Sequence, residues 1–228
     1  MPWHAHSVSQ RQSASTSTTS LRSLSPARRR PTHERSVTVR PSIQRLLDAM
    51  DGTVAAFVCS PSMDIVARNG LGAALFCHWR VLEGRQANQA RFVFLDPLAP
   101  ELFADWERSP DGIVAILRSL AGRDPHDTSL AAIIGELSMK SDAFRAMWAR
   151  HDVGNRYSGI KRFRHPLVGE LVLDVDVIPL PADPGLTLIA HSAEAGTPSA
   201  AALRLLASAS ADTAVRTAAP ATSDPGPR

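Results

Sequence analysis

Residues 135–176 read GELSMKSDAFRAMWARHDVGNRYSGIKRFRHPLVGELVLDVD, and this stretch decides the fold. Apolar side chains at Phe144, Met147 and Trp148 lie on one face of a helix that follows Ser141, a residue suited to a helix N-cap. Two strand-like segments then flank a turn at 165–169, as in a β-hairpin. A helix that leads into a hairpin is typical of an α+β domain.

The hydrophobic periodicity outside this stretch also predicts an α+β domain. Alternating or apolar segments predict strands at 54–59, 63–67, 159–164, 170–178 and 186–191. Apolar residues at helical spacing predict helices that include Ile43, Ile113, Leu130 and Phe144, and one more after Pro198. Two strands, a run of helices and three strands form a PAS-like order. We therefore expect an α+β, PAS-like domain with an antiparallel five-stranded sheet and helices over one face.

Charge and composition divide the chain into three parts. Residues 1–40 hold seven Arg against one Glu, so the total charge of +3 leaves residues 41–228 mildly acidic. We expect 1–38 to be a disordered basic leader rich in Ser, Thr and Arg, 39–210 to fold as one domain, and 211–228 to be a disordered tail. The leader would contact DNA only non-specifically, through counterion release, or would simply be solvated.

Other classes of protein are disfavoured by what the sequence lacks. No apolar run approaches the ~20 residues of a membrane span, and the polar N-terminus does not resemble a secretory signal. Cys59 and Cys77 form no CxxC motif and are expected to be buried thiols in a reducing cytoplasm. Motifs for nucleophiles, nucleotides and metals are absent as well, so we expect no enzyme activity, no cofactor and no metal site.

Five strings carry a resemblance to a known family. They are the opening stretch, RPSIQRLLDAM (40–50), NQARFVFLDP (88–97), PELFADWE (100–107) and SAEAGTPSAAALRLLAS (192–208). Together they resemble the ligand-binding domain of the MmyB-like helix-turn-helix transcription regulators, over roughly residues 40–207. Such proteins carry an N-terminal DNA-binding domain followed by a PAS-like sensor domain. The resemblance implies a site for a fatty-acid-like or other apolar effector between the sheet and its helices.

The sequence departs from similar sequences at three places. Arg68 stands where Trp is usual, and Val175-Asp176 stands where an aromatic residue and an acidic residue are usual. HSAEAGT at 191–197 stands where strings of the YTAE type are usual. Each of these changes would alter the shape of a ligand cavity.

The candidate ligand contacts form an aromatic and a polar group. The aromatic candidates lie mainly on faces expected to point inward: Phe57, Phe76, Phe94, Phe144 and Trp148. The polar candidates for a ligand head group are taken from the family motifs by position: Asn88, Arg91, His151, Lys161 and His165. A carboxylate would need an Arg, Lys or protonated His donor in a partly dry site. Two alternatives stay open. The aromatic rings would simply fill a solid core, or His151 would cap its own helix and not contact a ligand.

The function predicted is ligand sensing in a bacterial transcription regulator. A dimerisation or modulator module without a ligand and a small acyl-hydrolase that uses Ser158 or His151 are the alternatives. Residues 1–40 show no helical period, so we expect the helix-turn-helix head to be absent. The preferred explanation for its absence is that the gene product is truncated, or that its start was placed too far downstream. A degenerate paralogue and a stand-alone sensor are the other two explanations. We expect a homodimer or an association with full-length relatives.

Overall fold

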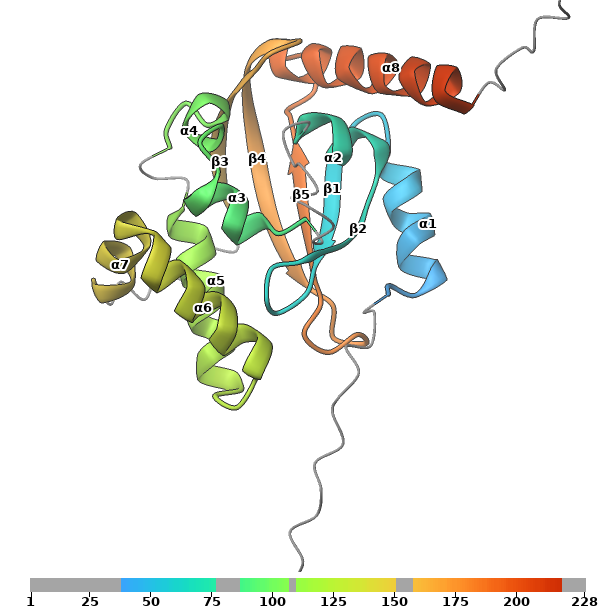
Figure 1. Ribbon diagram of the computed structural model, residues 1–228. Coiled ribbons are helices and arrows are strands. Elements are labelled where there is room, and N and C mark those ends of the chain that lie inside the picture. Colours follow the sequence, from blue (N-terminus) through green and yellow to red (C-terminus); the bar gives the residue numbers. More distant parts are fainter. Residues whose placement is uncertain (1–37, 77–86, 107–109, 151–157, 219–228) are drawn as a thin grey trace, which may run out of the picture. The chain divides into compact units, whose positions relative to one another are not determined.

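A five-stranded antiparallel sheet organises the chain (Figure 1). The computed structural model describes residues 38–76, 87–106, 110–150 and 158–218. The strands are β1 (Ala55–Cys59), β2 (Ile65–Arg68), β3 (Ser158–His165), β4 (Gly169–Pro179) and β5 (Thr187–Ser192). Their order in the sheet is β2-β1-β5-β4-β3, and all neighbours are antiparallel. The five strands predicted from the sequence, and their union in one antiparallel sheet, are confirmed.

Eight helices complete the α+β fold in the described residues. They are α1 (Pro41–Met50), α2 (Gly70–Leu75), α3 (Gln89–Leu95), α4 (Ala99–Leu102), α5 (Asp111–Arg123), α6 (Thr128–Lys140), α7 (Asp142–Ala149) and α8 (Pro198–Ala218). The periodic segments predicted α1, α5, α6, α7 and α8, whereas α2, α3 and α4 are too short to show a helical period. Helix α8 continues past residue 211, where the sequence predicts a disordered tail. Within the described ranges, no helix is long and apolar enough to cross a membrane.

The β3–β4 hairpin has one buried and one exposed face because its sequence alternates. In β4, Leu173 and Val175 are buried, whereas Asp174 and Asp176 beside them are exposed. The turn between the strands places Gly169 at φ +77°. A glycine adopts this left-handed conformation without strain, and so the turn can be short.

The sheet carries helices on both faces, which corrects the expectation of helices over one face. On the main face, Phe57 of β1 belongs to a large core shared with the other helices. On the opposite face, Ala56 and Val58 of β1 form a second core with Ile43 and Leu47 of α1. Strand β1 is therefore buried along its whole length, in keeping with its unbroken apolar sequence AAFVC.

Asn69 fixes the start of α2 against β1. Its Oδ1 accepts hydrogen bonds from the N–H groups of Gly72 at 2.8 Å and Ala56 at 3.0 Å. Its Nδ2 donates to the carbonyl groups of Val54 at 2.8 Å and Leu47 at 3.2 Å. This arrangement brings α2 so close to β1 that a Cβ on Gly72 would lie 2.5 Å from the carbonyl oxygen of Ala56. A residue without a Cβ is required there.

The close approach of α2 to β1 predicts opposite effects of alanine at two helical glycines. Gly72→Ala should lower the free energy of unfolding by about 2 kcal/mol or more, because backbone atoms would have to move. Gly135→Ala is the matched control, since its Cβ would meet nothing within 4 Å. It should raise that free energy by about 0.5–1 kcal/mol through helix propensity. Urea denaturation measures both values, and equal effects would contradict the close approach.

Candidate ligand-binding site

A cleft opens between α5 and the inner face of the sheet. It consists of two cavities of about 250 Å³ and about 270 Å³, which share Ile116 of α5 and Val177 of β4 as lining residues. We call them together the α5–β4 cleft. Its apolar lining includes Ile113, Ile116, Leu120, Val175, Val177, Leu180, Leu186 and Ile189. Gly112 and Gly159 also line it, and a Cβ on either would meet nothing within 4 Å, so the chain leaves this space open.

Lys161 lines the smaller cavity of this cleft. Its Nζ lies 5.4 Å from the centroid of the Phe103 ring, a cation–π distance. Among the described residues, no carboxylate lies within ion-pair distance of Nζ, and Asp105 on the same cavity wall is paired with Arg162 at 3.5 Å. Burial lowers the pKa of Lys161 from 10.5 to about 8. At neutral pH this group is still mainly a cation, and it can receive an anionic ligand.

Phe57 and Phe76 lie in a packed aromatic cluster at the centre of the main core. Their ring centroids are 5.5 Å apart, edge to face, and Phe76 also meets Phe163 at 5.8 Å. The ring of His191 stacks on Phe57 at 5.8 Å. These four side chains are at most 2% exposed, and none of them lines the α5–β4 cleft. A ligand contact at Phe57 or Phe76 stays a prediction.

The other aromatic candidates join helices to one another. Phe94 of α3 meets Phe144 of α7 edge to face at 5.1 Å, and Phe144 stacks on Trp148 at 5.4 Å. Arg118 of α5 lies 5.2 Å from the centroid of the Trp148 ring and donates a hydrogen bond to the Trp148 carbonyl. These contacts hold α7 against α3 and α5. Their part in ligand binding stays a prediction as well.

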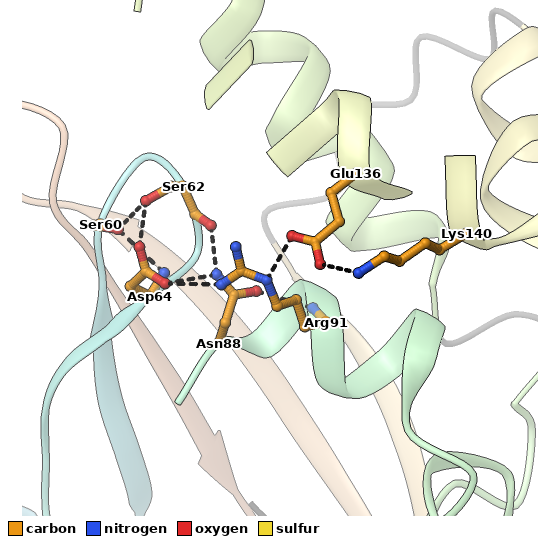
Figure 2. A network of polar contacts seen from close by, with 7 residues as sticks. All are labelled: Ser60, Ser62, Asp64, Asn88, Arg91, Glu136 and Lys140. Atoms are coloured by element: carbon orange, nitrogen blue, oxygen red, sulfur yellow. Dashed lines mark hydrogen bonds and ion pairs between the residues drawn. The ribbon is translucent and has the colours of Figure 1, made fainter. Parts of the chain in front are cut away.

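Asn88 and Arg91 belong to a polar network that links the β1–β2 turn to α3 and α6 (Figure 2). Asn88 caps α3, since its Oδ1 accepts a hydrogen bond from the Arg91 N–H at 2.9 Å. Its Nδ2 donates to the Ser62 carbonyl at 2.7 Å and to the Asp64 carboxylate at 2.8 Å. Arg91 Nε donates to Glu136 Oε2 at 2.9 Å, and its Nη1 lies 3.6 Å from Asp64. Both candidates therefore have partners within the protein.

Glu136 is held ionised at the centre of this network. Lys140 Nζ donates to its Oε1 at 2.9 Å, opposite the guanidinium of Arg91 (Figure 2). Burial disfavours the ionised carboxylate, but the hydrogen bonds and charges of Lys140 and Arg91 outweigh burial and lower the pKa of Glu136. The network thus stabilises the attachment of α6 to α3.

Of the two histidine candidates, His165 lies in the described part of the chain and His151 does not. His165 is buried, with its Nε2 3.0 Å from the Ala74 carbonyl oxygen, and its Nδ1 accepts a hydrogen bond from the Leu167 N–H at 3.2 Å. Because a carbonyl can only accept, Nε2 carries the proton. His151 lies outside the described residues. Among the predicted ligand contacts that the structure describes, Lys161 is the one that lines the α5–β4 cleft.

Sequence reasoning missed His191. It is fully buried at an inward position of β5, paired in the sheet with Ala55 and Val175. Neither ring nitrogen has a partner in hydrogen-bond geometry among the described residues. Burial lowers its pKa from 6.5 to about 3, aided by the charge of Lys161 and partly opposed by the backbone of Ala55. The one ionisable residue in the strand TLIAHS was the signal that could have revealed it.

Comparison with known families gives the identity of the domain. A family model of the MmyB-like transcription regulator ligand binding domain matches residues 39–206. The chain belongs to this family. No curated protein was found to match the chain. The MmyB-like family is one of regulator ligand-binding domains and not of enzymes, which removes the support for an acyl-hydrolase.

The MmyB-like match includes both walls of the α5–β4 cleft, since α5, β4 and β5 lie within it. The cleft also lies where the sequence predicts a ligand, between the inner face of the sheet and a covering helix. In the described part of the chain, no three His, Cys, Asp or Glu side chains gather in a group that could hold a metal ion. The apolar residues that line the cleft suit an organic ligand with apolar parts.

The polar network predicts unequal effects at its two cations. Arg91→Met should lower the free energy of unfolding by about 1–2 kcal/mol, because it leaves two half-buried carboxylates with fewer partners. Lys140→Met should cost less than about 0.5 kcal/mol, because this side chain is 58% exposed. Urea denaturation at neutral pH compares the two variants. Equal losses in the free energy of unfolding would show that the ion pairs of Arg91 contribute no more than an exposed ion pair does.

His191 predicts a pH dependence of stability. Below pH 6.5 the unfolded chain binds a proton at His191 that the folded chain does not bind until about pH 3, so stability falls as the pH falls through this window. Between pH 7 and pH 5 the folded protein should lose about 2 kcal/mol from this residue. His191→Phe keeps a ring and should remove that loss. Urea denaturation at both pH values measures the difference, and parallel losses in both proteins would contradict a buried neutral imidazole.

Proposed function

We propose that this chain senses an apolar small molecule with an anionic head group, of the fatty-acid type, in the α5–β4 cleft. The observation that carries this proposal is the position of Lys161, a cation at one end of a cleft whose lining is partly apolar and also includes Asp105 and Asp111. No counter-charge from the described residues lies within ion-pair distance of its ammonium group. A carboxylate would supply one, and the alkyl chain would lie along Ile116 and Val177 toward the β4–β5 turn.

Binding would act on transcription through α5, which forms one wall of the cleft and contacts α6 and α7. A ligand that fits one position of α5 better than another would shift the population toward it. We place the regulator in the bacterial cytoplasm, as a homodimer or in association with full-length relatives that carry a DNA-binding domain. The basic leader lies outside the described residues and would add non-specific DNA contacts.

A dimerisation or modulator module without a ligand is the second candidate function. It is favoured by the packed rings of Phe57, Phe76 and Phe163, which fill the centre of the main core. The two candidates are separated by native mass spectrometry of the full chain purified from a bacterial host, followed by denaturing extraction. A fatty acid or similar molecule carried at near one-to-one would support ligand sensing. Protein that carries nothing and shows no thermal shift with a panel of lipids would favour the module.

The role of Lys161 predicts a selective loss of affinity. Lys161→Met should weaken the binding of decanoate by about 10- to 100-fold, since a hydrogen bond to a charged group contributes about 1.5–3 kcal/mol. Binding of decanol, which lacks the charge, should change little. Lys140→Met is the control, because that lysine pairs with Glu136 outside the cleft. Calorimetric titration of the unchanged protein and both variants measures all six affinities, and an equal loss for decanoate and decanol would contradict a charge contact.

A further inference from the structure

The chain contains two lysines, and their surroundings are opposite. Lys140 ends α6 with its side chain 58% exposed, and its Nζ donates to Glu136 at 2.9 Å. Lys161 is half-buried on the wall of the α5–β4 cleft, with its Nζ over the Phe103 ring. No carboxylate of the described residues is in ion-pair distance of it. One amine is thus solvated and paired, and the other borders a cavity of about 250 Å³.

Burial lowers the pKa of Lys161, although the Phe103 ring and two carboxylates of the cavity favour its protonated form. Leu173 of β4 lies beside it in the sheet, and His191, which is buried and uncharged at neutral pH, lies near it on the same face. Two carboxylates line the cavity: Asp105 is paired with Arg162, and Asp111 lies in the first turn of α5. With burial lowering the pKa of Lys161 to about 8, about 10% of the amine is uncharged at pH 7. An ordinary lysine would have about 0.03%.

We infer that Lys161 is a nucleophile that forms a reversible imine with an apolar aldehyde held in the α5–β4 cleft. In this reaction the uncharged Nζ attacks the carbonyl carbon, and a proton moves from nitrogen to the carbonyl oxygen to give a carbinolamine. Loss of water then leaves the imine carbon doubly bonded to Nζ, and hydrolysis reverses the reaction. An uncharged amine in a partly apolar pocket is what such chemistry requires.

This inference rests on the proposed function of the cleft and adds a covalent class of ligand to it. The alkyl chain of the aldehyde would take the place proposed for that of a fatty acid, along Ile116 and Val177. A carboxylate and an aldehyde would compete, because a bound carboxylate keeps Lys161 protonated. The domain would then distinguish an aldehyde from its oxidised acid by whether a covalent bond forms.

The test treats the full chain with decanal and cyanoborohydride at pH 7, which reduces an imine to a stable secondary amine. Intact mass and peptide mapping locate the adduct and separate Lys161 from Lys140 and from the N-terminal amine. We expect at least about tenfold more adduct at Lys161 than at Lys140, because more of the Lys161 amine is uncharged at this pH. Excess decanoate should suppress it. Lys161→Arg should abolish this adduct, whereas Lys140→Arg should retain it.

The outcomes separate the two proposals. Binding of decanoate or decanol without an adduct at Lys161 would overturn the imine and leave the cleft as a ligand site. Equal labelling of both lysines would also overturn the imine, because Lys161 would then react as an ordinary surface amine. No binding of decanoate, decanol or decanal would overturn both proposals. Circular dichroism of each variant confirms that a lost adduct does not come from a lost fold.

Discussion

The antiparallel pairing of β1 with β5 is the contact on which the rest of the structure depends. It joins two ends of the domain, with Phe57 opposite Ile189, and places β5 between β1 and β4. Closing such a long loop costs conformational entropy, which burial of apolar surface must offset. The two cores on either face of β1 supply that burial, one with α1 and one with the remaining helices. A strand buried on both faces can hold its register firmly, because a slip would exchange the two cores.

That register also explains why a histidine lies in the core. With Ala55 opposite residue 191, the side chain there must point into the aromatic cluster. An imidazole without hydrogen bonds costs about 1–3 kcal/mol in such a place, and its contacts with Phe57, Phe76 and Phe163 offset part of the cost. An uncharged His191 has a consequence for the cleft. Because it carries no charge at neutral pH, it does not repel the ammonium group of Lys161.

The sequence predicts the strands and the long helices well, because alternation and helical spacing are local properties. It does not predict α2 and α3, because they are held by the caps of Asn69 and Asn88 and by packing against β1 and α6. The candidate site shows the same limit. Phe57 is a candidate because the periodicity points it inward, and Lys161 is one because of its position in a family motif. Which of them borders a cavity depends on where α5 lies over the sheet, and packing among α5, α6 and α7 decides this.

The inner face of the sheet is divided between a filled part and an open part, and side-chain size accounts for the division. The ring of Phe76 meets those of Phe57 and Phe163, and all three are buried in the filled part. Under α5 the sheet offers the shorter Val175, Val177 and Ile189, and two glycines, Gly112 and Gly159, add no side chain at all. Packing against α6 and α7 holds α5 in its place beside this space. A ligand there would touch α5 as well as the strands β4 and β5. Because α5 contacts α6 and α7, a shift of α5 would reach these two helices.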